Sequence, residues 1–212
     1  MLDFHRLPLF FAASIILLLT PGPAVICIIT RSASQGRLAG LVSVLSIETG
    51  NLFHALAAAL GLSALLLSSA LAFTALKYLG AAYLIYLGLR KLFAREQTSG
   101  PLVLEPQSLR RIYSQGVVVA ILNPKTALFF VAFLPQFVDP AQGTSALQLL
   151  ELGCLFVLMA LVSDGLYALL AGRLAQWFKS RQTLGNLGRY LTGSVYIGLG
   201  ITAALADGGH HS

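Results

Sequence analysis

Charged side chains are scarce in this sequence. They make up 10% of its 212 residues, while hydrophobic residues make up 57% and the mean hydropathy is +0.80. Soluble domains carry roughly 25% charged residues, so this chain has too few to cover a surface that faces water. The composition excludes an ordinary soluble domain and indicates an integral membrane protein.

Cysteine is almost absent. The two present, Cys27 and Cys154, lie in apolar stretches without C-x-x-C spacing, so we interpret both as packing residues. A membrane thiol–disulfide conduit that uses both thiols is an alternative of another class, but neither cysteine has an activating neighbour.

Clusters of metal-binding side chains are also missing. No group of Cys, His and carboxylate stands at ligand spacing, so we expect no metal site and no cofactor. Export of a metal cation or another small metabolite is therefore the weaker alternative within transport. The net charge of +6 does not form a basic patch interleaved with aromatics, so nucleic acid is not an expected partner, and we do not expect an enzyme.

Six apolar runs are long enough for transmembrane helices, which need about 20 residues each. The first exceeds the roughly 7–15 residues of a signal-peptide core and no A-x-A site follows it, so we interpret it as a span. We expect one transmembrane domain, all α-helical and embedded in the lipid bilayer. The expected spans are 7–30, 39–68, 70–90, 116–138, 146–172 and 187–206.

The basic residues predict the orientation. With six spans, the loops on one side carry 11 Lys and Arg residues and those on the other side carry only Arg6 and Lys77. Because the rich side is cytoplasmic in most membrane proteins, both termini should lie outside the cytoplasm. The rich side holds Arg31, Arg37, Arg90, Lys91, Arg95, Arg110, Arg111, Arg173, Lys179, Arg181 and Arg189.

The chain also resembles itself. The stretch KYLGAAYLIYLGL at 77–89 aligns with RYLTGSVYIGLGI at 189–201, and LTP at 19–21 aligns with LNP at 122–124. Three spans per unit is an odd number, so the second unit enters the membrane from the opposite side. We predict two inverted three-helix repeats, about 1–93 and about 116–206, joined by a cytoplasmic loop at about 94–115, with a substrate site near the midplane.

Prolines interrupt two corresponding spans. Pro21 and Pro23 flank Gly22 in the first, and Pro124 follows Asn123 in the fourth. A proline removes a helix hydrogen bond, and freed carbonyls at membrane depth must face protein or a water-filled cavity. Paired breaks therefore predict a substrate site, although a packing kink is the simpler interpretation of any single proline.

Lys125 is the most costly residue in the expected spans. A lysine at a helix centre costs roughly 2.5–3.5 kcal/mol, so Lys125 should face the interior. Its partner is an acidic side chain, freed backbone carbonyls or the carboxylate of a substrate. If the fourth span begins later, Lys125 lies at the interface between membrane and water instead.

The second and fifth spans carry the remaining buried polar groups. Glu48, Asn51 and His54 are three residues apart, which places them along one helix stripe. Asp164 occupies the corresponding part of the fifth span. We expect Glu48 and Asp164 to couple transport to protons or to form a structural ion pair, and we expect His54 to be a packing residue.

These motifs resemble the LysE/RhtB family of amino-acid exporters. The likeness rests on TPGPAVICIITRSASQGRLAGL, TGNLFHALAAALGLSALL, LKYLGAAYLIYLGLRKL and LNPKTALFFVAFLPQFV, and it covers nearly the whole chain. It implies a six-helix inner-membrane exporter of amino acids or their derivatives, driven by proton antiport and dimeric. By this resemblance the motif positions are Pro21, Gly22, Pro23, Asn123, Pro124 and Lys125.

The sequence departs from the family pattern at two positions. Ala24 stands where many relatives carry a polar residue, and Glu48 stands where the pattern is small or apolar. An added carboxylate favours a cationic substrate or pairs with Lys125. The expected mechanism places the substrate carboxylate on Lys125 and its ammonium, or a proton, on Asp164 or Glu48, with Asn51 alongside.

Overall fold

The computed structural model describes residues 7–20, 22–62, 106–139 and 142–180, with isolated positions between 74 and 93 and at 197 and 201. All elements in the described part are helical and none is a strand, which confirms the all-α expectation. The expected third and sixth spans fall outside the described residues except for those isolated positions, so the inverted repeat stays a prediction.

The first span consists of two helices. Helix α1 (Leu7–Leu19) and helix α2 (Pro23–Gln35) are bent by 50° relative to one another. Helix α3 (Arg37–Ala57) follows and continues as the π-helical turn η1 (Ala58–Leu62). Gly36 separates α2 from α3 with φ +89°, a left-handed conformation that glycine adopts without steric cost.

The fourth span is broken in the same way. Helix α6 (Leu109–Ile121) and the segment that starts with α7 (Pro124–Leu128) are bent by 43°. This segment continues through the π-helical turn η2 (Phe129–Phe133) and the 3₁₀ turn η3 (Leu134–Phe137). Helix α8 (Ser145–Ser180) follows.

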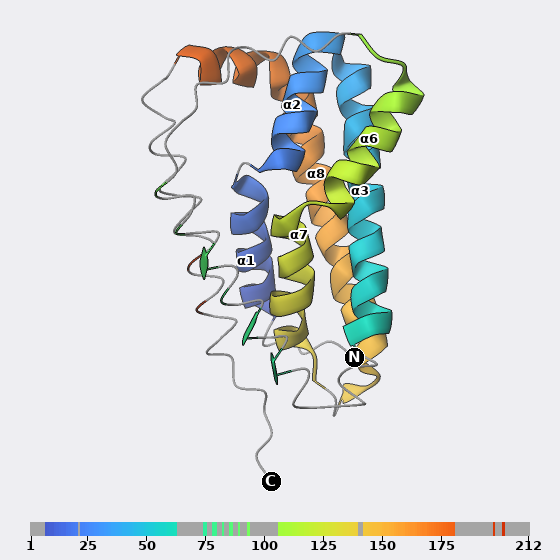
Figure 1. Ribbon diagram of the computed structural model, residues 1–212, viewed down its shortest axis with the longest axis vertical. Helices are drawn as coiled ribbons and strands as arrows, with labels where there is room; N and C mark the ends of the chain where they lie inside the picture. Colours follow the sequence, from blue (N-terminus) through green and yellow to red (C-terminus); the bar gives the residue numbers. More distant parts are fainter. Residues whose placement is uncertain are drawn as a thin grey trace.

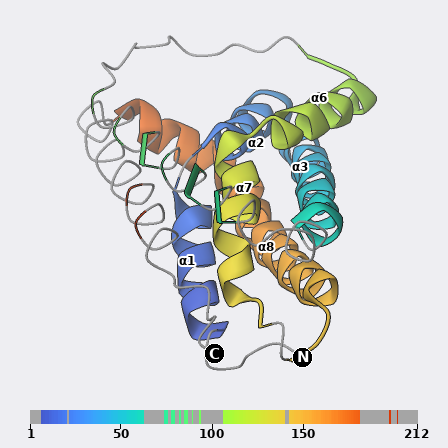
Figure 2. The same cartoon turned by 60° about the horizontal axis from the view of Figure 1, so that its bottom comes forward.

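Two described helices are long and apolar enough to cross a membrane unaided, and four spans result if each bent pair is one span. The first bent pair rises from α1 to α2 in Figure 1, whereas the second descends from α6 to α7. Helices α2 and α6 lie at one end of the bundle and α1 and α7 at the other in both views (Figure 1 and Figure 2). Such opposite directions are what an inverted repeat requires.

Several described helices begin or end away from the expected boundaries. The fourth helix begins at Leu109 rather than at 116, because the Ser108 side chain caps it by accepting a hydrogen bond from the Arg111 amide at 3.4 Å. The first span extends to Gln35 rather than to 30. Arg31 is therefore a helix residue and not the loop residue that the charge pattern suggested. Helix α8 runs to Ser180 rather than to 172, so Arg173 and Lys179 are helix residues too.

Arg31 closes the end of the bundle where α2 meets α6. It is buried, and its guanidinium donates hydrogen bonds to the side-chain oxygens of Gln35, Gln107 and Gln115, each at 2.9 Å. Gln35 belongs to α2, Gln107 precedes α6 and Gln115 lies within α6. One cation thus joins the two half-helices at this end.

Small residues let α3 approach its neighbours. A Cβ atom built on Gly50 would lie 2.4 Å from the Cβ of Ala120 on α6, and one built on Gly153 of α8 would lie 2.6 Å from the Cβ of Ala55. Close helix contacts of this kind are typical of membrane bundles, where van der Waals packing replaces the hydrophobic effect. They fix α3 between α6 and α8.

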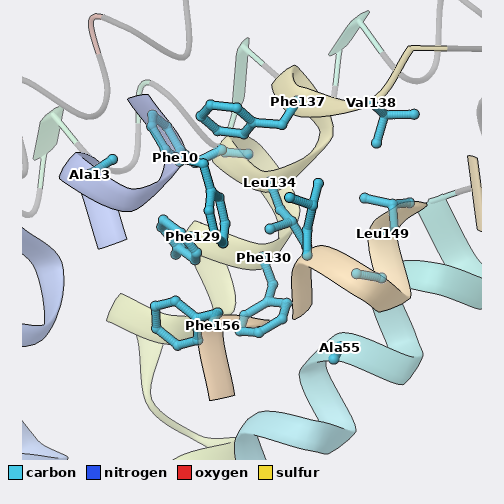
Figure 3. Close-up of a cluster of buried hydrophobic side chains, with 14 of the residues drawn as sticks. Phe10, Ala13, Ala55, Phe129, Phe130, Leu134, Phe137, Val138, Leu149 and Phe156 are labelled. Carbon is cyan, nitrogen blue, oxygen red and sulfur yellow. The ribbon is translucent and has the colours of Figure 1, made fainter. Parts of the chain in front are cut away.

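Phenylalanine rings close the opposite end of the bundle, where α1 meets the segment after α7. Figure 3 shows Phe10, Phe129, Phe137 and Phe156 among the side chains of this cluster. The ring centroids of Phe129 and Phe156 are 4.7 Å apart, and those of Phe10 and Phe137 are 5.5 Å apart. The cluster joins α1 to α8.

Candidate functional site

The break in the first span removes the usual α-helical donors of two carbonyl groups, although the Leu17 carbonyl keeps a shorter-range bond from the Thr20 amide at 3.2 Å. Helix α1 ends at Leu19 and α2 begins at Pro23, with Gly22 as its N-cap. The carbonyls of Leu17 and Leu19 would each accept from the amide four residues later, but those residues are Pro21 and Pro23, which have no N–H. Pro21 itself lies outside the described residues.

Side chains from other spans bind these carbonyls. The ammonium of Lys125 donates to the carbonyl oxygens of Leu17 at 2.5 Å and Thr20 at 2.6 Å. The hydroxyl of Tyr167 on α8 donates to the carbonyl oxygen of Leu19 at 3.4 Å. Side chains of the fourth and fifth spans therefore satisfy the backbone carbonyls at the first break.

The motif Asn-Pro-Lys starts α7. Asn123 is the N-cap, and its side-chain oxygen accepts from the backbone amide of Lys125 at 3.2 Å. Its side-chain nitrogen donates to the hydroxyl of Thr126 at 3.1 Å. Pro124 occupies the first helical position, where its missing N–H costs nothing. The motif combines a helix start with a lysine that reaches the other broken span.

Lys125 lies inside the protein and not at an interface. Only 7% of it is exposed, and of the partners left open by the sequence its ammonium takes the freed carbonyls. Gly22 makes room for the lysine stem, since a Cβ atom there would lie 3.2 Å from Cδ of Lys125. Gly22 has φ −133°, a conformation open to any residue, so space and not backbone geometry explains the glycine.

Two carboxyl groups and one amide are buried on the helices that face Lys125. Glu48 and Asn51 on α3 and Asp164 on α8 are each 4% exposed. The Asn51 side-chain nitrogen donates to a carboxylate oxygen of Glu48 at 3.0 Å. The carboxyl groups of Glu48 and Asp164 lie close enough to interact directly, and Asp164 also acts electrostatically on Lys125.

A small cavity lies between the two helix breaks. Its volume is about 30 Å³, which is room for one or two water molecules. Both polar and apolar residues line it. The polar set is Asn51, Asn123, Lys125, Thr126 and Asp164; the rest is Leu17, Leu18, Gly22, Ala24, Val25, Ile47 and Phe156.

The cavity brings together most of the residues singled out in the sequence. Gly22, Asn51, Asn123, Lys125 and Asp164 line it. Pro23 and Pro124 instead begin the helices beside it, and Glu48 contacts Asn51 and Asp164 without lining it.

The sequence pattern did not point to several residues at or near the site, among them Thr126, Phe156 and Tyr167. Thr126 follows Lys125 directly, a signal that could have been read. Phe156 stands in an apolar run that distinguishes no position. Tyr167 lies three residues after Asp164, and its spacing from Leu19 along the chain gives no signal.

His54 and the two cysteines lie outside this arrangement. A ring nitrogen of His54 lies 3.1 Å from the carbonyl oxygen of Ala120, and the ring stacks on Phe130. His54 is therefore a packing residue, as expected. Cys27 is half-buried on α2, Cys154 is exposed on α8, and both are free thiols. The described residues contain no group of three or more His, Cys, Asp and Glu side chains that could hold a metal ion.

The chain is similar to known membrane proteins over nearly its whole length. The chain matches the family described as LysE type translocator over residues 15–207. It is 33% identical over 197 residues to a homoserine/homoserine lactone efflux protein of Salmonella typhimurium, covering 93% of this chain and 95% of that protein. An uncharacterized membrane protein of Pseudomonas aeruginosa is 32% identical over 199 residues, covering 91% of each chain.

No solved structure matches the chain. The family match nevertheless spans both helix breaks, α3, α8 and every residue that lines the cavity. This chain is a membrane protein that belongs to the LysE type translocator family.

Proposed function

We propose that the protein exports amino acids or their derivatives across the inner membrane by proton antiport. The observation that carries the proposal is a buried cation and a buried carboxylate, Lys125 and Asp164, that line one cavity between two broken helices. Opposite charges on two walls of a cavity suit a zwitterion. The efflux protein of Salmonella typhimurium, whose name specifies homoserine and its lactone, supports the same substrate class.

The substrate carboxylate binds Lys125, and its ammonium binds Asp164, with Asn51 and Glu48 alongside. Lys125 uses two of its three N–H donors on the carbonyls of Leu17 and Thr20, and the third can bind a carboxylate. The backbone at Pro21, Gly22 and Pro23 and at Asn123 and Pro124 forms the rest of the site. Pockets that hold small molecules measure roughly 300–1,000 Å³, so substrate entry widens this cavity.

Protons and the substrate ammonium compete for the same carboxyl groups. Glu48 and Asp164 interact inside the bundle, where two ionised carboxylates repel strongly. A proton or an ammonium relieves that repulsion, so each displaces the other. Protonation from outside then releases the substrate outward.

The whole transporter consists of two inverted repeats with both termini outside the cytoplasm, and it acts as a homodimer. The distribution of Lys and Arg supports this orientation, and the opposite directions of the two broken spans support the inversion (Figure 1).

Counterflow in proteoliposomes tests the proposal. Vesicles loaded with an unlabelled amino acid should accumulate the same labelled amino acid from outside, for at least one side-chain class. Net efflux should also accelerate when the outside is made more acidic. Absence of counterflow across all side-chain classes would refute amino-acid transport, and efflux independent of the proton gradient would refute antiport alone.

A further inference from the structure

Most buried polar atoms without a hydrogen-bond partner lie at the cavity or directly beside it. Among the described residues there are four: Ser14 Oγ, Glu48 Oε1, Asn51 Oδ1 and Asp164 Oδ1. The last three belong to neighbouring residues of α3 and α8, each of which is 4% exposed. Buried polar atoms are normally paired, so three orphans in one place indicate a ligand group.

When Glu48 and Asp164 are both ionised, all three of these atoms are acceptors. Ionised carboxylates accept hydrogen bonds only. The amide of Asn51 is oriented by its donation to Glu48 at 3.0 Å, which leaves its oxygen as the orphan. The ligand group that fits three acceptors is therefore a donor.

Most of the charged donor capacity at the cavity is already engaged. Lys125 donates to the carbonyls of Leu17 and Thr20, and the side-chain nitrogen of Asn123 donates to Thr126. One N–H of the ammonium is left for a substrate carboxylate, whereas three orphaned acceptors await a donor.

We propose that a primary ammonium is the group by which the site recognises its substrate, and that a free carboxylate is secondary. A primary ammonium brings three donors and no acceptor, which matches the three orphaned acceptors of Glu48, Asn51 and Asp164. This inference rests on the proposed function and narrows it to primary amines. Amino acids with a blocked carboxylate are accepted, whereas those with a blocked amine are rejected.

Two derivatives of one transported amino acid test this order of importance. The parent should carry an uncharged side chain, because Val25, Ile47 and Phe156 give the cavity apolar walls. The carboxamide keeps the ammonium and lacks the carboxylate; the N-acetyl compound keeps the carboxylate and lacks the ammonium. Each is added as a competitor in wild-type counterflow.

We expect the carboxamide to compete within roughly tenfold of the parent and the N-acetyl compound to be weaker by more than roughly tenfold, the cost of losing charge-assisted hydrogen bonds. Equal or stronger competition by the N-acetyl compound would overturn the inference while leaving amino-acid transport intact. If no parent amino acid is moved, the proposed function fails and takes the inference with it.

A pair of variants tests whether the orphaned acceptors bind the substrate ammonium. Asn51→Leu removes one orphaned acceptor and should weaken competition by the parent and the carboxamide alike, each severalfold. Ser14→Ala removes the orphaned hydroxyl that does not line the cavity. In this variant the parent and the carboxamide should compete as strongly as they do in the wild type. Equal behaviour of the two variants would contradict the assignment of Asn51.

Discussion

The ammonium group of Lys125 donates a hydrogen bond to the carbonyl oxygen of Leu17 at 2.5 Å, across 108 positions of the chain. The Leu17 carbonyl accepts from the Thr20 amide at 3.2 Å but lacks its α-helical donor, because Pro21, four residues later, has no N–H. Lys125 needs an acceptor because a lysine inside a membrane protein is costly when unpaired. Each of the two broken spans thus supplies what the other lacks.

The space beside Gly22 gives a first prediction. In Gly22→Ala the new Cβ would lie 3.2 Å from Cδ of Lys125, so the lysine stem must shift from its present rotamer. A shifted rotamer costs about 0.5–1.5 kcal/mol, which corresponds to a roughly two- to tenfold slower export. Export rates in proteoliposomes measure the effect.

Gly61→Ala is the matched control, since nothing lies within 4 Å of a Cβ atom there. It should export at the wild-type rate. Unchanged export by Gly22→Ala would show that the lysine stem is not confined as described.

The guanidinium of Arg31 gives a second prediction. Arg31→Lys keeps the charge but loses the planar fork that binds Gln35, Gln107 and Gln115. Hydrogen bonds to a charged group contribute about 1.5–3 kcal/mol each, so thermal stability in detergent should fall. Cys27, whose thiol lies near Arg31, should then react faster with a water-soluble maleimide.

Both measurements belong in a Cys154→Ser background, because Cys154 is exposed. Arg110→Lys, at an exposed position of α6, is the control and should change neither quantity. A Cys27 labelling rate that is the same in both variants would argue against a closing role for Arg31.

The contact between α3 and α6 gives a third prediction. Gly50→Ala places a Cβ atom 2.4 Å from the Cβ of Ala120, and overpacking of this kind typically costs about 1–3 kcal/mol. The melting temperature in detergent should fall. Adding Ala120→Gly should restore part of it, but not all, since the carbonyl of Val117 also lies only 3.2 Å away. No rescue at all would place the strain elsewhere.

The sequence predicted the helix breaks because proline acts locally. A residue without an N–H interrupts a helix wherever it stands, and both bends occur where Pro21, Pro23 and Pro124 place them. The burial of Lys125 was predictable for a similar reason, since its depth in the apolar run already excluded water as a partner.

The partner of Lys125 could not be predicted, because it depends on how the two broken spans face one another. Leu17 and Thr20 offer backbone oxygens, which every residue has, so no letter in the sequence marks them. The early start of α6 was missed because LRRIYSQ is polar, although its serine cap at Ser108 could have been recognised. The size of the cavity likewise depends on packing between elements.

The most direct test of the central claim is amino-acid export by Lys125→Ala in proteoliposomes, measured per correctly folded molecule. Tyr167→Phe is the matched control, because it too removes a donor to a freed carbonyl, that of Leu19, but no charge from the cavity. The account predicts that Lys125→Ala reaches the membrane and loses export while Tyr167→Phe retains it. Wild-type export by Lys125→Ala would contradict the account.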